Sequence, residues 1–166
     1  MQKALAEIEG LLSDEPENPY FLEMYGQIKV EMGKVEEGII PYRKAVEILP
    51  DAPLIRVALG AALLGAENPQ YAREAATQLQ MGLKQDSDDP YGWYELAEAW
   101  SRLGQTGKAE LATAERYFIL GVYPPAIQFA GRAQRYLPQG STDWQRAVDI
   151  IAISQTQQKA QGRGGR

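Results

Sequence analysis

The sequence contains neither cysteine nor histidine. Without cysteine the chain has no disulfides, no thiolate nucleophile and no cysteine-ligated zinc. Without histidine it lacks the commonest general base, the commonest metal ligand and every catalytic triad that depends on imidazole. We therefore predict that this chain is not an enzyme and holds no cofactor and no metal.

Long apolar runs and clusters of positive charge are also missing. The most apolar stretch, residues 57–64, is far shorter than the roughly 18 residues of a membrane span. The net charge is −5, and basic residues gather only in the last few positions. The first ten residues contain no apolar signal-peptide core. We therefore expect no membrane insertion and no nucleic-acid partner.

What is present is typical of a folded protein that repeats itself. Of the 166 residues 45% are hydrophobic and 23% are charged. Gly26 recurs as Gly60, and Pro16 recurs as Pro50, at one shared interval of about 34 residues. The interval from Gly60 to Ala97 is slightly longer, and the extra residues fall in the segment AENPQ, where a loop insertion costs little. A period of this length is the signature of stacked helix pairs.

The clearest copy of the repeat is the segment PYGWYELAEAWSRLGQTGKA. Its consensus places are occupied by Trp93, Leu96, Ala97, Trp100, Gly104 and Ala109. This spacing resembles the tetratricopeptide repeat. The predicted fold is therefore all-α, a tetratricopeptide-type helical hairpin solenoid with a C-terminal capping helix.

Local signals place the helices. Pro19, Pro53 and Pro90 fit the first turn of a helix, and Gly33 and Gly104 fit left-handed C-terminal caps. We expect helices over residues 2–13, 19–32, 35–49, 53–65, 70–85, 90–104, 107–120, 124–137 and 142–158. They group into a half repeat 1–16, repeats 19–52, 53–89 and 90–138, a capping helix 142–158 around Trp144 and a disordered tail 159–166.

The register is ambiguous after Gly104. The helix over 107–120 fits the second helix of a repeat through Ala109. It fits a first helix equally well through Ala114, Tyr117 and Gly121.

Two long runs resemble a particular group of tetratricopeptide arrays. They are ENPYFLEMYGQIKVEMGKVEEGIIPYRKAVEILPDAPLIRVALGAALL and TAERYFILGVYPPAIQFAGRAQRYLPQGSTDWQRAVDI. Both are similar to the C-terminal arrays of bacterial CAAX-prenyl-protease-like zinc metallopeptidases, periplasmic enzymes with an HExxH motif. Because the chain starts on the second helix of a repeat, we expect it to be a C-terminal fragment.

The resemblance implies a periplasmic scaffold that guides outer-membrane-protein substrates or partners and packs on a peptidase domain. The HExxH motif itself has no counterpart here, because the chain has no histidine. The alternative is a stand-alone tetratricopeptide adaptor in a cytoplasmic or envelope complex.

The concave face of such an array predicts the binding residues. We expect a protein or peptide ligand in a groove formed by Tyr20, Glu23, Gln27, Leu54, Val57, Tyr91, Tyr94 and Glu98. The alternative is that its tyrosines only cover neighbouring helices. The groove lacks the Lys, Arg and Asn of a carboxylate clamp, and its acidic edge favours a ligand with apolar anchors and some basic character.

Two other groups of residues are expected to be structural. Trp93, Trp100, Tyr25, Tyr42 and Tyr117 stand at consensus packing places and are predicted core residues. The acidic run over residues 86–89 lacks the glycine and the glutamate of a calcium loop, so we interpret it as a helix-capping loop.

Overall fold

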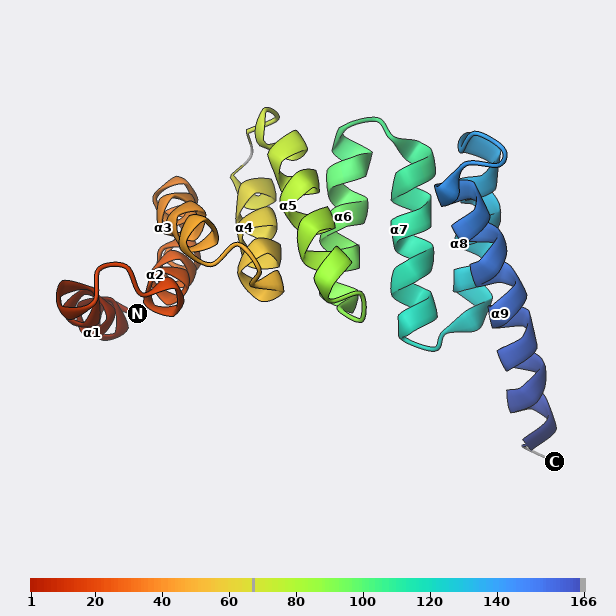
Figure 1. Cartoon of the computed structure of the whole chain (residues 1–166), viewed down its shortest axis with the longest axis horizontal. Coiled ribbons are helices and arrows are strands. Elements are labelled where there is room, and N and C mark those ends of the chain that lie inside the picture. Colours follow the sequence, from red (N-terminus) through yellow and green to blue (C-terminus); the bar gives the residue numbers. More distant parts are fainter. Residues whose placement is uncertain (67, 165–166) are drawn as a thin grey trace. The chain divides into compact units, whose positions relative to one another are not determined.

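The computed structural model describes residues 1–66 and 68–164, in which all regular structure is helical. These residues form α1 (Gln2–Asp14), α2 (Pro19–Glu31), α3 (Val35–Ile48), α4 (Pro53–Gly65), α5 (Tyr71–Gln85), α6 (Pro90–Arg102), α7 (Thr106–Ile119), α8 (Tyr123–Tyr136) and α9 (Thr142–Gly164) (Figure 1). They divide into two compact units, residues 1–87 and 88–166.

The predicted helices α1 to α8 are confirmed to within two residues at each end. The last helix differs, because α9 runs on to Gly164 through the segment predicted to be a disordered tail. Residues 157–161 are Gln, Gln, Lys, Ala and Gln, which are good helix formers that extend an anchored helix at little cost. Residues 165 and 166 lie outside the described part of the chain.

The capping signals act as expected. The carboxylate of Asp89 accepts a hydrogen bond from the backbone N–H of Tyr91 at 2.9 Å and so caps α6. Gly33 has φ +78° and Gly104 has φ +68°, in the left-handed region. Beyond Gly33 the N–H of Lys34 donates to the carbonyl of Lys29 at 2.9 Å, the bond of a Schellman cap.

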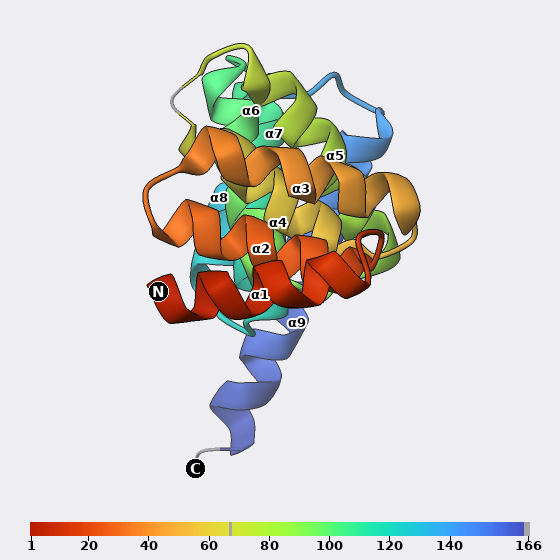
Figure 2. The ribbon, with the colours of Figure 1, turned by 90° about the vertical axis from the view of Figure 1, so that its left-hand side faces the viewer.

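The first unit consists of the hairpins α2–α3 and α4–α5, with α1 packed on α2 (Figure 2). Glycine allows the helices of each hairpin to approach closely. A Cβ at Gly26 would lie 2.8 Å from the ring of Tyr42, and one at Gly60 would lie 2.5 Å from Cγ of Leu79. The predicted role of these small residues is therefore confirmed.

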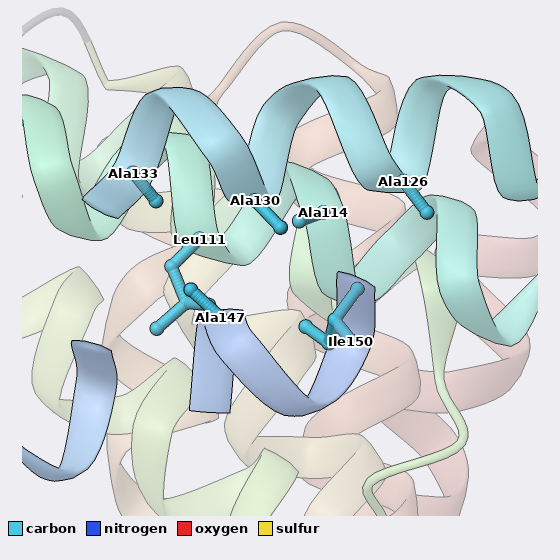
Figure 3. Packing of buried hydrophobic residues seen from close by; sticks show 7 residues of the cluster. All are labelled: Leu111, Ala114, Ala126, Ala130, Ala133, Ala147 and Ile150. Carbon is cyan, nitrogen blue, oxygen red and sulfur yellow. The ribbon is translucent and has the colours of Figure 1, made fainter. Parts of the chain in front are cut away.

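The core of the second unit is built largely from alanine (Figure 3). Its fully packed members are Leu111, Ala114, Ala126, Ala130, Ala133, Ala147 and Ile150, from α7, α8 and α9. Beside them the rings of Tyr117 and Phe129 stack with their centroids 5.5 Å apart. Short side chains bring the three helices close together, so that α8 and α9 both pack on α7.

Helix α7 fits both repeat registers that the sequence leaves open. It packs against α6 as the second helix of a hairpin and against α8 as the first helix of the next. Like α2 and α6, it ends at a left-handed glycine, Gly121 with φ +69°. The N–H of Val122 then donates to the carbonyl of Tyr117 at 2.9 Å.

A bidentate ion pair joins α9 to α7. Nε and a terminal nitrogen of Arg146 donate to the two carboxylate oxygens of Glu115 at 2.6 and 2.7 Å. The Glu115 side chain is only 7% exposed. Pairing with Glu115 raises the pKa of the Arg146 guanidinium, which therefore stays charged at neutral pH.

The prediction of core aromatics holds only in part. Tyr42 is buried, but Tyr25, Trp93, Trp100 and Tyr117 are half-buried. A cation lies over the rings of Tyr25, Trp100 and Tyr117, and the ammonium of Lys108 is 4.4 Å from the centroid of the Trp100 ring. Large rings at these places therefore cover the hairpins from the edge instead of filling their centres.

Candidate partner-binding site

In the first unit, two of the predicted groove residues present apolar surface to solvent. Tyr20 on α2 and Leu54 on α4 are 60% and 65% exposed, and they occupy equivalent places in successive repeats. Gln27 is exposed and donates to Glu31 within its own helix at 2.9 Å. Partial burial raises the pKa of the Glu23 carboxyl above its ordinary value.

Val57 does not belong to an exposed surface, and its assignment to the groove was wrong. The side chain is 4% exposed and points into the α4–α5 hairpin. There it lies opposite Gly82, where an added Cβ would be 3.1 Å from a Val57 methyl carbon. Gly82 lets α5 approach so closely that the short valine side chain is enclosed.

In the second unit, the predicted residues Tyr94 and Glu98 line a cavity of about 370 Å³, which we call the α6–α8 cavity. It lies between α6, α7 and the edge of α8, and its other lining residues include Glu110, Thr113, Arg116 and Phe129. This volume is within the range of small-ligand and side-chain pockets.

Arg116 provides positive charge in this cavity. Its guanidinium carbon lies 5.0 Å from the centroid of the Tyr94 ring and 5.8 Å from that of Tyr117. Stacking of this kind holds the planar guanidinium in place while its edge keeps donors for a ligand. Glu98, by contrast, is already engaged, since it accepts from Arg102 at 2.8 Å.

Glu110 provides a buried acceptor in the same cavity. Its Oε2 lies 2.9 Å from Nε of Arg132, but the two atoms are not aligned for a hydrogen bond. Both atoms are buried and make no other hydrogen bond among the described residues. Arg132 is instead held over the ring of Phe129, with its guanidinium carbon 4.0 Å from the centroid. The carboxylate of Glu110 is therefore held by charge pairing with Arg132.

Tyr91, the remaining predicted residue, does not line the cavity. It is 53% exposed, and partial burial of its hydroxyl together with the nearby carboxylate of Glu95 raises its pKa to about 12. Burial in turn raises the pKa of the Glu95 carboxyl. Tyr91 therefore stays neutral at physiological pH and acts as a hydroxyl donor or acceptor.

Sequence reasoning missed most of the lining residues, among them Glu110, Arg116 and Phe129. The prediction drew only on the first helix of each hairpin, whereas these residues come from α7 and α8. The sequence did contain a signal for these residues, because α7 fits two repeat registers. A helix that belongs to two hairpins presents side chains to both of them. The presence of Arg116 changes the expected charge of the site from acidic to mixed.

The described residues do not fit a zinc site. They contain no histidine or cysteine, and nowhere in residues 1–66 and 68–164 do three Asp or Glu side chains gather as metal ligands. Within the same residues, no helix has the length and apolar character required to cross a membrane.

The repeating hairpins, the left-handed glycines and the close glycine contacts define a tetratricopeptide-type helical repeat fold, an architecture whose extended surfaces bind other proteins. Solved structures agree. MamA from Desulfovibrio magneticus RS-1 superposes with a TM-score of 0.67 at 17% identity, covering 96% of this chain and 86% of that one. A thermophilic TPR protein from Thermus thermophilus gives 0.53 at 17% identity and covers 89% of each chain.

Among curated proteins, the chain is similar to the β-barrel assembly-enhancing proteases of Escherichia coli K12 and Shigella flexneri. Each is 29% identical over 134 residues, which is 81% of this chain and 27% of the relative. The chain thus spans about a quarter of the length of these relatives. No family model matches it. The predicted resemblance to a metallopeptidase-associated tetratricopeptide array is therefore supported by an independent comparison.

Proposed function

We propose that this chain is a non-catalytic scaffold that binds polypeptide segments in the α6–α8 cavity, as the substrate- or partner-binding region of a periplasmic zinc metallopeptidase. The observation that carries the proposal is the cavity of about 370 Å³ around Tyr94. It combines the aromatic ring of Tyr94, the guanidinium of Arg116 and the carboxylate of Glu110.

These groups match the chemistry of a peptide. Phe129 and Tyr94 offer apolar surface to a side chain, Arg116 can donate to a backbone carbonyl or a carboxylate, and Glu110 can accept from a backbone N–H. Such a combination recognises extended polypeptide and does not require one fixed sequence. Because the chain has no histidine or cysteine to hold a catalytic zinc ion, we propose that zinc-dependent cleavage is performed by residues outside it.

The similarity to β-barrel assembly-enhancing proteases supports the proposal that the parent protein is a peptidase. It also supports the proposed class of ligand. Their name associates them with the assembly of β-barrels, so we propose that the ligand is an unassembled strand segment of an outer-membrane β-barrel. Such strands alternate apolar and polar side chains, which suits a cavity with an aromatic wall and a charged rim.

Titration of the chain with fluorescent peptides that tile the strands of one outer-membrane β-barrel tests the proposal. The wild-type chain is expected to bind a subset of the peptides, and Tyr94→Ala to weaken that binding about ten-fold, the effect of losing one aromatic contact. Arg116→Gln should weaken it further and reduce its dependence on salt.

Tyr136→Ala is the matched control, since Tyr136 on α8 is 63% exposed and does not line the cavity. Circular dichroism confirms that each variant is folded. Equal binding by Tyr94→Ala and Tyr136→Ala would exclude the cavity as the binding site.

A further inference from the structure

In the first unit, the second helices of successive repeats are α1, α3 and α5, and we call the space between two of them a seam. The two seams are equivalent in the repeat but are closed to different degrees. The first seam lies between α1 and α3, over α2, and contains a cavity of about 450 Å³. Its lining is largely apolar and includes Leu12, Leu22, Tyr25, Ile40, Pro41 and Lys44. A shift by one repeat maps this lining onto the second seam, between α3 and α5.

A long side chain of the chain itself fills the second seam. Arg56 occupies the place equivalent to Leu22 and is only 6% exposed. Its Nε donates to the carbonyl of Pro50 at 2.7 Å, and a terminal nitrogen donates to Gln78. In the first seam Leu22 is too short to reach that far, and the corresponding volume stays open.

An ion pair also bridges the second seam and has no equivalent in the first. Arg43 and Glu74 form two hydrogen bonds of 2.8 and 2.7 Å between α3 and α5. The residues at the same places one repeat earlier are Glu9 and Ile40, which cannot pair. Ile40 is 67% exposed at the edge of the cavity.

Among the charged side chains that line the first seam, Lys29 and Lys44 outnumber Glu37. Lys29 and Lys34 share the carboxylate of Glu37, at 3.1 and 3.4 Å. The ammonium of Lys44 donates to a neutral group, the carbonyl of Pro16 at 3.2 Å, and forms no ion pair among the described residues. One lysine at the mouth is therefore available to a carboxylate.

We propose that the first seam is a second docking site, distinct from the α6–α8 cavity, for a partner segment with a bulky apolar side chain next to an acidic residue. The apolar side chain enters the volume that Arg56 fills in the second seam and covers Ile40. The neighbouring carboxylate pairs with Lys44. The occupant thus supplies the two elements, filling and charge pairing, with which the chain closes its own second seam.

Two synthetic fluorescent peptides probe this site. One carries leucines at helical spacing between glutamates, and its twin carries lysines in place of the glutamates. The chain is expected to bind the acidic peptide and to prefer it to the basic twin, and Lys44→Gln should abolish the preference. Two closing variants are designed to block the site. Leu22→Arg introduces the residue type that fills the second seam. Ile40→Glu replaces the exposed apolar side chain at the edge of the cavity and alters no buried residue.

Each closing variant should weaken binding of the acidic peptide about ten-fold or more, as expected for the loss of one leucine-sized contact. Met24→Glu is the control, because Met24 on α2 is an exposed apolar residue of the same unit that does not line the seam. The proposal is overturned if the chain binds neither peptide or both alike, or if folded Ile40→Glu binds as well as Met24→Glu. Self-association in sedimentation experiments that Ile40→Glu abolishes would also overturn it, by assigning the seam to a second copy of the chain.

Discussion

Removal of Arg146 should release α9 from the second unit, because it leaves Glu115 as a buried charge without a partner. The Glu115 side chain is 7% exposed and that of Arg146 is 40% exposed. Breaking a fully buried ion pair costs about 3–5 kcal/mol. Since the guanidinium is partly hydrated, we expect Arg146→Ala to lower the free energy of unfolding by about 2–3 kcal/mol.

Two further variants separate charge from packing. Glu115→Gln keeps the shape and loses the charge, and should cost about 1–2 kcal/mol. Replacing both residues with leucine leaves no buried charge, so the double variant should be within about 1 kcal/mol of the wild type. This recovery distinguishes an unpaired charge from simple loss of contacts.

Denaturation followed by circular dichroism measures these differences, and hydrogen exchange of the α9 amides locates them. The control is the exposed pair between Glu98 and Arg102, which lies within one helix. Glu98→Ala should change the stability by no more than about 0.5 kcal/mol. If Arg146→Ala costs no more than Glu98→Ala, the pair does not hold α9 and the reasoning is refuted.

Further predictions concern glycines and pH. Gly60→Ala should destabilise the first unit by about 1–3 kcal/mol in denaturant melts, because the new Cβ would lie 2.5 Å from Leu79. Gly10→Ala, within α1 and with no atom within 4 Å of its Cβ, should instead stabilise it by about 0.5–1 kcal/mol, and a loss there would contradict the helix assignment. Burial raises the pKa of Glu23 above 4.5, so its contribution to stability is present below that pH and is lost as the pH rises through the folded-state pKa. Glu23→Gln should therefore raise the melting temperature at pH 7 but not at about pH 4, and an equal gain at both pH values would show that burial of the charge is not the cause.

The helices could be predicted because their ends are specified locally. Proline at a first turn, a capping carboxylate such as Asp89 and a left-handed glycine such as Gly33 act within a few residues of where they stand. The repeat period then predicted the pairing of helices. The extension of α9 was missed because glycine and polar residues suggested disorder, although the intervening residues favour helix.

The candidate site could be predicted less completely, because packing between helices decides which side chains remain accessible. Val57 occupies a groove place by register, yet the absence of a side chain at Gly82 lets α5 enclose it. Arg116 and Phe129 enter the site only because α7 pairs with both its neighbours. The difference between the two seams likewise depends on one equivalent place, where Arg56 is long enough to bond to Pro50 and Gln78 and Leu22 is not. Helix periodicity does not predict those partners.

Site-specific photocrosslinking tests the central claim, that the chain binds polypeptide at the α6–α8 cavity, most directly. A benzophenone side chain is placed at position 94, or at the control position 136, and the chain is irradiated with the β-barrel strand peptide that binds it best. The account predicts a covalent adduct from position 94 that excess unlabelled peptide suppresses, and little or none from position 136. Adducts from position 136 alone, or equal adducts from both positions, would contradict it.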